Sequence, residues 1–189
     1  MLVYSSSLRN VPILSLQTGT VLAQTGQPVI DPRRLYIVAF YCDGPLLDHH
    51  PSLLHTDDIR EFSDVGMIVN HSGDLMPPDD LVRLQEVIDF KFNLLGRAVI
   101  DTSRARLGTV EDFATETSSF MIKKLSVRRP LLKSLSTSKL LIDRQQIVEV
   151  SNDYIVVRHE TAKQQPIAAR FKPVATNPFR AKANPQTDT

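Results

Sequence analysis

The stretch "LIDRQQIVEVSNDYIVV", residues 141–157, has nearly the same pattern as a stretch earlier in the chain. The stretch "LLHTDDIREFSDVGMIV", residues 53–69, repeats its polar segment and its closing run of apolar residues. Ile147 matches Ile59 at an offset of 88 residues. A repeat of this length has the size of a small domain, so the chain is predicted to contain one fold written twice.

The repeat continues upstream of these two stretches. "VPILSLQTGTVLAQ" (11–24) aligns with "RAVIDTSRARLGTV" (97–110) at an offset of 86, and each reads as two apolar strands around a turn. Next, "RLYIVAFYC" (34–42) aligns with "SFMIKKLSV" (119–127) at an offset of 85. Both alternate in the manner of a strand with one buried face, so a third strand is predicted after each hairpin.

Each repeat therefore reads as four or five short antiparallel strands with one helical turn. Strands this short are expected to curl into a small barrel, because an open apolar edge invites aggregation. The predicted fold class is all-β, with two tandem small antiparallel β-barrels. We expect residues 11–75 (the first repeat) and 93–157 (the second repeat) to superpose, within domains that cover residues 1–76 and 93–158.

The segments outside the repeats have a different character. Residues 77–92 are predicted to form a linker helix, with Asp79 as its N-cap after two prolines and with apolar residues at helical spacing. Residues 159–189 contain four prolines and an excess of basic residues without any periodicity. This basic tail is predicted to be disordered.

Composition limits the class of protein. The 22 Lys and Arg residues nearly balance the 21 Asp and Glu residues, which excludes a uniformly basic nucleic-acid binder. Cys42 is the single cysteine, so no intramolecular disulfide is expected, and its predicted role is that of a small buried apolar residue. The start of the chain lacks a signal-peptide pattern, and no apolar run is long enough to span a membrane. We expect a soluble, cytoplasmic protein without membrane insertion.

Charge is distributed unevenly along the chain. Residues 43–80 contain nine acidic residues and one basic residue, whereas residues 121–144 contain seven basic residues and one acidic residue. Three interpretations stay open: solvated faces without a partner, a basic docking surface on the second barrel, or complementary packing of the two barrels.

The second repeat resembles the PRC-barrel family, in which a hairpin, a strand and an "I....I..v..d.iiv" ending follow one another. The first repeat is similar to the same domain through Ile13, Gly19, Val21 and residues 59–69. In the second repeat, the residues that carry the resemblance are Gly96, Val99, Leu107, Gly108, Val110, Asp112, Ile142, Ile147, Val150, Ile155 and Val156.

This resemblance implies a non-enzymatic adaptor. PRC-barrels are similar to the C-terminal domain of a ribosome maturation factor, which contacts a ribosomal protein, and to the cytoplasmic domain of the photosynthetic reaction centre H subunit. Neither barrel is an enzyme. The family therefore implies docking of a protein partner, with ribosome maturation or RNA processing as the expected setting.

Catalytic and metal-binding patterns are weak. The sequence has no CxxC or HExxH spacing, no nucleophile elbow and no glycine-rich phosphate loop. His49, His50 and His55 with Asp48 and Asp58 have the side-chain types of a metal cluster, but a solvated loop is the favoured interpretation. We expect no catalytic residue, no metal and no cofactor.

The predicted partner-binding residues are basic side chains of the second repeat and two aromatic side chains of the tail. In the alternative function, an RNA-binding module, the same cations and the basic tail contact phosphates. The oligomeric state stays open. The predicted residues are Lys123, Lys124, Arg128, Arg129, Lys133, Phe171 and Phe179.

Overall fold

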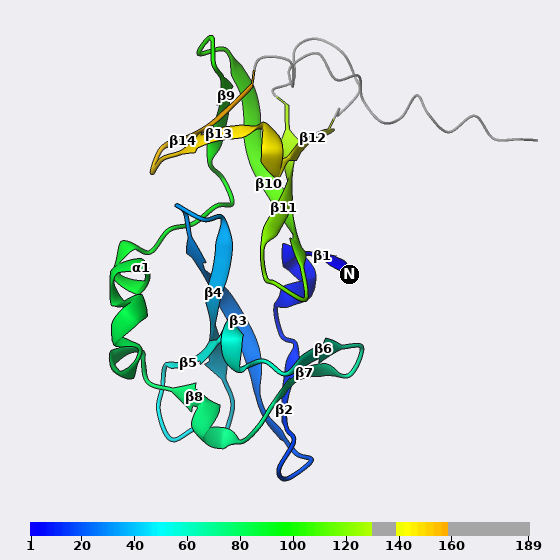
Figure 1. The fold of residues 1–189 in the computed structure, drawn as a ribbon, viewed down its shortest axis with the longest axis vertical. Coiled ribbons are helices and arrows are strands. Elements are labelled where there is room, and N and C mark those ends of the chain that lie inside the picture. Colours follow the sequence, from blue (N-terminus) through cyan, green and yellow to red (C-terminus); the bar gives the residue numbers. More distant parts are fainter. Residues whose placement is uncertain (130–138, 159–189) are drawn as a thin grey trace, which may run out of the picture.

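The computed structural model describes residues 1–129 and 139–158, which are mostly β-structure arranged in two sheets. Figure 1 shows these sheets one above the other along the longest axis of the molecule, with the second repeat at the top. The helix α1 (Gln85–Phe90) lies beside the lower sheet. The predicted all-β class is therefore confirmed at the level of a β-rich fold.

The first sheet is built by residues of the first domain, up to Met76. It has seven strands in the order β6-β7-β2-β3-β4-β5-β8. Their bounds are β2 (Pro12–Ser15), β3 (Val21–Asp31), β4 (Tyr36–Asp43), β5 (Ser52–His55), β6 (Glu61–Ser63), β7 (Gly66–Val69) and β8 (Leu75–Met76).

The second sheet also has seven strands. Six follow the order β12-β11-β10-β9-β14-β13, and β1 from the N-terminus pairs with β10. Their bounds are β1 (Leu2–Tyr4), β9 (Ala98–Asp101), β10 (Arg106–Glu116), β11 (Ile122–Arg128), β12 (Lys139–Asp143), β13 (Ile147–Val150) and β14 (Tyr154–Val157).

The two sheets repeat one topology. In each, a hairpin is followed by a third and a fourth strand, and a final strand returns to pair in parallel with the first, as β7 does with β2 and β14 with β9. A 3₁₀ turn precedes the last hairpin of each repeat, at Thr56–Asp58 and Arg144–Gln146. The predicted hairpins and helical turns are confirmed. The prediction that all strands pair antiparallel is wrong, because the closing strand of each repeat pairs in parallel with the first. Within the described residues, hydrogen bonds do not close either sheet into a ring, so the two barrels stay a prediction.

Backbone conformation repeats even where residue types do not. Three positions with positive φ recur at offsets of 85 or 86 residues. In the second repeat, the carboxylate of the buried Asp101 accepts hydrogen bonds from the N–H groups of Ser103 and Ala105, each at 2.9 Å. Arg104, between these two residues, has a left-handed backbone conformation. The three pairs of positive-φ residues are Asn10 and Gly96, Gly19 and Arg104, and Leu35 and Phe120.

One continuous hydrophobic cluster runs through both repeats, with residues of β2, β3 and β4 and of β9, β10 and β11 among its members. Cys42 and Val127 are the next-to-last residues of β4 and β11, and both are buried, which confirms the predicted strand alignment. Burial raises the pKa of the Cys42 thiol to about 12. The thiol is therefore protonated and packed at neutral pH.

The two repeats meet at a junction formed by Leu35–Ile37 and Phe120–Ile122. Its hydrogen bonds are reciprocal: the N–H of Ile37 donates to the carbonyl of Phe120 at 3.0 Å, and the N–H of Ile122 donates to that of Leu35 at 2.9 Å. Positions 85 residues apart therefore exchange equivalent bonds, as in an isologous dimer interface. The ring of Phe40 packs edge-on against Phe120, with ring centroids 5.7 Å apart.

The linker is less helical than predicted. Two 3₁₀ turns, Pro78–Asp80 and Val82–Leu84, precede α1, so Asp79 lies inside a turn and does not cap the helix. The backbone of Leu81 leaves the helical region between the two turns, which explains the break. Leu81 and Ile88 are buried in a second cluster, against Val29, Val38, Ala39 and Leu53. The linker thus covers one face of the first sheet.

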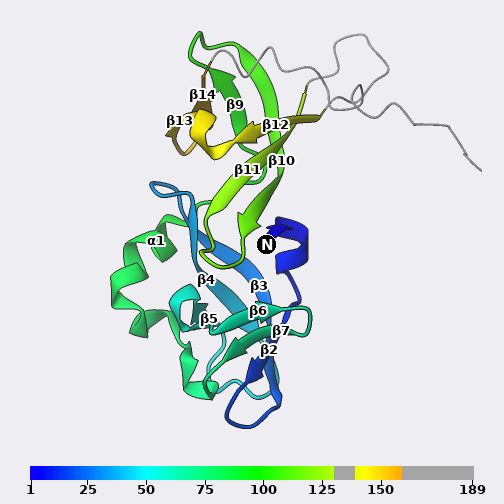
Figure 2. The same ribbon diagram turned by 45° about the vertical axis from the view of Figure 1, so that its right-hand side comes forward.

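The N-terminal segment packs on the second repeat, although it precedes the first. Val3 of β1 lies opposite Thr115 of β10, and the 3₁₀ turn Ser5–Leu8 continues the contact. Figure 2 shows this segment beside β10. The backbone N–H and the hydroxyl of Ser5 both donate to Oδ1 of Asp112. A carboxylate of the second repeat therefore holds the start of the chain.

Replacing Asp112 with alanine is expected to loosen this segment selectively. The change leaves the N–H of Ser5 without its partner, a loss of about 1 to 2 kcal/mol for a charge-assisted bond. Amide hydrogen exchange of residues 2–5 is then expected to accelerate by about tenfold. Glu111→Ala serves as the control, since this exposed neighbour contacts Lys139 instead. Equal exchange in both variants would contradict the anchoring role of Asp112.

Candidate functional site

The predicted basic residues of the second repeat lie on or just after β11. Lys124 and Arg128 are exposed, whereas Lys123 and Arg129 are half-buried. Lys123 occupies an irregularity in the pairing of β10 with β11, which places it beside Lys124. The structure therefore brings four predicted residues onto one strand and its end. Lys133, Phe171 and Phe179 lie outside the described residues.

Ion pairs reduce the positive charge of this surface. The Lys123 Nζ atom lies 3.2 Å from Oε2 of Glu116, and the Lys139 Nζ atom lies 3.2 Å from Oε2 of Glu111. Hydrogen bonds from the Ser119 hydroxyl and from Lys123 hold the pKa of Glu116 below its ordinary value. Such exposed pairs add little stability, but they neutralise charge.

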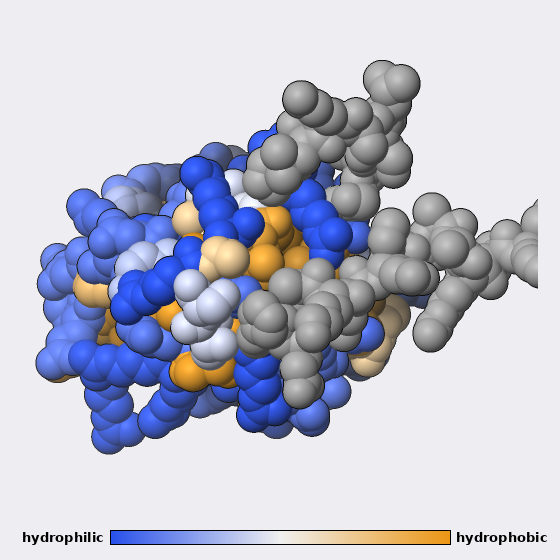
Figure 3. All heavy atoms as spheres, turned by 90° about the horizontal axis from the view of Figure 1, so that it is seen from above, coloured by the Kyte–Doolittle hydropathy of each residue, from blue (hydrophilic) through white to orange (hydrophobic). Residues whose placement is uncertain are grey.

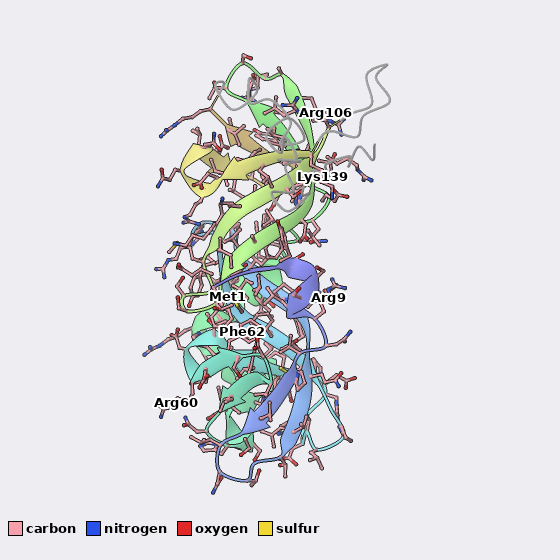
Figure 4. All side chains as sticks on the ribbon, turned by 90° about the vertical axis from the view of Figure 1, so that its right-hand side faces the viewer. Met1, Arg9, Arg60, Phe62, Arg106 and Lys139 are labelled. Carbon is pink, nitrogen blue, oxygen red and sulfur yellow. The ribbon has the colours of Figure 1, made fainter. Side chains whose placement is uncertain are left out.

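Two cations of this surface, Lys124 and Arg128, form no ion pair within residues 1–129 and 139–158. Both side chains are exposed. Figure 4 shows the paired Lys139 on the same repeat, below Arg106. Lys124 and Arg128 therefore both contribute positive charge to this surface.

Of these two cations, Lys124 lines a shallow hollow on the side of the second sheet that faces away from the core. We call this side the outer face and define it by Ala114, Lys123, Lys124, Ser126, Arg128 and Leu141. Strand alternation sets it apart, because Phe113, Leu125 and Ile142 belong to the hydrophobic cluster on the opposite side. The hollow has a volume of about 170 Å³ and is lined by Leu2, Tyr4, Ala114, Lys124, Ser126 and Leu141.

The first sheet shows what can cover such a face. By strand register, Lys124 corresponds to Ala39, because the residues paired with them on β10 and β3 are equivalent in the two repeats. Leu141 corresponds to Leu53 in the same way. In the first repeat, Ala39 and Leu53 are buried under Leu81 of the linker. In the second repeat, Lys124 is exposed and Leu141 only half-buried.

Sequence reasoning missed the N-terminal contribution to the hollow. Leu2 and Tyr4 are 49% and 52% exposed, so β1 adds apolar surface next to Lys124. The short apolar run in "MLVYS" is compatible with a strand, but nothing local to it indicates a partner strand more than 100 residues away. Apolar surface also shows at the far end of the second repeat, where Figure 3 shows hydrophobic residues among hydrophilic ones.

The histidines and carboxylates weighed as metal ligands do not gather. Within the described residues, no group of three or more His, Cys, Asp or Glu side chains is arranged to hold a metal ion. The Nδ1 atom of His55 accepts the N–H of Asp57 at 3.1 Å, which is a turn contact. Partial burial raises the pKa of Asp58.

Comparison with known proteins leaves the geometry as the main guide. No protein-family model matches the chain. No curated protein matches it either. Among the helices of the described residues, none is long and apolar enough to cross a membrane.

Proposed function

We propose that the protein is a non-enzymatic adaptor that docks a protein partner on the outer face of the second repeat. The observation that carries the proposal is the contrast between the two sheets. The linker buries Ala39 and Leu53 on the first sheet, whereas the equivalent Lys124 and Leu141 stay accessible on the second. A partner segment that covers the outer face of the second sheet, as the linker covers the first sheet, would bury Leu141 and the exposed side chains of β1.

The chemistry of the face favours a particular partner. Lys124 and Arg128 attract carboxylates, while Leu2, Tyr4 and Leu141 offer apolar contact. The linker itself has this mixed character, since Leu81 and Ile88 pack inward and Asp89 stays exposed. The proposed partner is therefore a protein segment with apolar anchors and acidic neighbours, in ribosome maturation or RNA processing as the PRC-barrel resemblance implies.

The proposal includes the architecture of that family. Each repeat is proposed to be a small PRC-like barrel, whose sheet curls around the shared core. Support comes from the repeated strand order and from β3 and β10, which are eleven residues long and each interrupted by register shifts. Such irregularities bend a strand and allow a sheet to curl.

RNA binding is the second candidate, and one observation favours it. Lys124 and Arg128 are exposed cations without ion pairs among the described residues, as phosphate contacts require. The pairing of Lys123 and Lys139 with carboxylates weighs against it, because those cations are already neutralised. Protein docking is therefore placed first.

Charge reversal on the outer face tests the proposal. The variant Lys124→Glu with Arg128→Glu is expected to weaken binding of a host protein, identified by cross-linking and then purified, by at least about tenfold. The matched control reverses two exposed cations elsewhere, Arg33→Glu with Arg83→Glu, and is expected to bind normally. Unfolding temperatures are expected to stay close to that of the unaltered protein.

The same variants separate protein docking from RNA binding. Binding of a uridine 20-mer, titrated with salt, would show a steep loss of affinity if phosphates are the ligand. A double variant that loses the oligonucleotide but keeps the protein supports the RNA function instead. Equal capture of the protein partner by the charge-reversed and control variants would refute docking on the outer face.

A further inference from the structure

One difference between the two sides of the junction is the presence of an arginine that crosses it. Arg144 reaches from the second repeat to the first, where its guanidinium donates to the carbonyl oxygen of Leu35 at 3.1 Å and to that of Arg34. The side chain is half-buried. One side of the junction is therefore filled by an arginine that binds backbone carbonyls across the repeat boundary.

The equivalent of Arg144 in the first repeat is Thr56. Each residue begins the 3₁₀ turn that precedes the last hairpin of its repeat. The hydroxyl of Thr56 donates to the carbonyls of Ile37 and Val38 within its own repeat, at 3.1 Å each. A threonine is also too short to cross the junction, so the second side lacks the arginine that fills the first.

A cleft lies on this second side, and we call it the junction cleft. Its volume is about 660 Å³, within the range of ligand-binding clefts. Thr56 and Phe120, the equivalents of Arg144 and Leu35, both line it, which shows that it occupies the symmetry-related position. The lining residues are Tyr36, Thr56, Asp57, Ile59, Arg60, Glu61, Phe62, Thr117, Ser118 and Phe120.

The lining suits a planar cation. Tyr36, Phe62 and Phe120 supply aromatic rings, and the exposed Asp57 and Glu61 supply carboxylates. The lining also includes one cation, Arg60, but its Nε atom donates to Oδ1 of Asn70 at 2.8 Å. In Figure 4, Phe62 lies near the middle of the long axis, where the repeats meet, and Arg60 lies farther from that level.

We infer that the junction cleft binds an arginine side chain from a peptide segment of a partner protein. A guanidinium stacks on aromatic rings, pairs with carboxylates in a fork geometry and donates to carbonyls. Arg144 shows the last of these contacts at the equivalent position. Charge agrees as well, because residues 43–80 carry nine acidic residues and one basic residue. A basic segment is therefore drawn to this side of the molecule.

This inference stands apart from the proposed docking on the outer face. The junction cleft and the hollow share no lining residue. A failure of either site leaves the other unaffected, provided that each is tested with its own probe. The experiment below accordingly uses a small arginine compound and not the protein partner of the outer face.

The test measures binding of Nα-acetyl-arginine amide to the full chain by NMR titration. Amide signals of residues 56–62 and 117–120 are expected to shift, with a Kd of roughly millimolar size for a single side chain. The neutral isostere Nα-acetyl-citrulline amide is expected to bind at least about tenfold more weakly, because it cannot pair with carboxylates. Equal binding of the two compounds, or shifts confined to other residues, would overturn the inference.

Two variants locate the site. Asp57→Asn with Glu61→Gln is expected to weaken the arginine compound by about tenfold, whereas the matched control Glu149→Gln, at the equivalent position of Glu61, leaves it unchanged. Thr56→Arg places an arginine where Arg144 stands in the other repeat, so the compound is expected to be excluded. If Thr56→Arg fails to fold, the Asp57→Asn with Glu61→Gln variant alone tests whether the compound binds in the junction cleft. Unchanged binding in the Asp57 and Glu61 variant refutes the site.

The chain's own tail is the competing source of arginine, because residues 159–189 contain Arg170 and Arg180. A chain ending at residue 158 distinguishes the two sources. Equal affinity of the full and shortened chains for the arginine compound supports a partner's arginine. An affinity about tenfold higher after truncation would show that the tail competes for the junction cleft, and would overturn the assignment to a partner.

Discussion

Replacing Phe40 with alanine is expected to lower the free energy of unfolding by about 3 to 5 kcal/mol. The side chain is fully buried, and its ring packs edge-on against Phe120 across the junction. The cavity would open in the cluster that both repeats share, where neighbouring residues are held by two sheets and relax little. Urea denaturation followed by circular dichroism measures the change.

The matched control is Phe90→Ala in the linker helix. Phe90 is 47% exposed and stacks on Phe92, so its removal is expected to cost less than about 1 kcal/mol. Because the core cluster is continuous, the unaltered protein is also expected to unfold in one cooperative transition. Two separate transitions, or a smaller effect at Phe40 than at Phe90, would show that the junction carries little of the stability.

Gly108→Ala is expected to lower the free energy of unfolding by about 2 to 4 kcal/mol, the sum of overpacking and backbone strain. A Cβ atom at this position would lie 2.2 Å from the carbonyl oxygen of Arg128, and the φ of Gly108 is +155°. Relief of that contact requires β10 and β11 to move apart, which weakens their pairing. Thermal and urea denaturation measure the loss.

Gly96→Ala separates strain from crowding. The φ of Gly96 is +84°, but no atom lies within 4 Å of the Cβ that alanine would add. Only the strain of a left-handed residue remains, about 1 to 2 kcal/mol. Equal losses for the two variants would mean that the strands at Gly108 adjust freely, and that the close approach to Arg128 has no structural role.

The repeat could be predicted from the sequence because apolar spacing survives substitution. Ile59 and Ile147 each directly follow the 3₁₀ turn of their repeat, and the hairpins around Gly19 and Arg104 follow from their apolar flanks. The match in backbone conformation is not visible in the sequence, because Gly19 and Arg104 share a positive φ but are chemically unlike. The pairing of β1 with β10 was also beyond local pattern, because it joins distant segments.

The candidate site was predicted only in part, for a related reason. Lys123 and Lys124 stand out as charges in the sequence, but the neutralising Glu116 comes from another strand. The junction cleft left no signal at all, because it depends on Thr56 being small where Arg144 is long. The meaning of such a difference becomes clear only when the fold shows that the two positions are equivalent by symmetry across the junction.

The packing of the N-terminal strand on the second repeat has a consequence for biosynthesis. β1 is synthesised before its partner strand β10, and Ser5 and its partner Asp112 are separated by 107 residues. At about 5 to 20 residues per second, the N-terminal strand waits roughly 5 to 20 s for its place in the second sheet. During that time Leu2, Val3 and Tyr4 are available to any nascent-chain binding factor, and folding of this edge is completed only after residue 116 has been made.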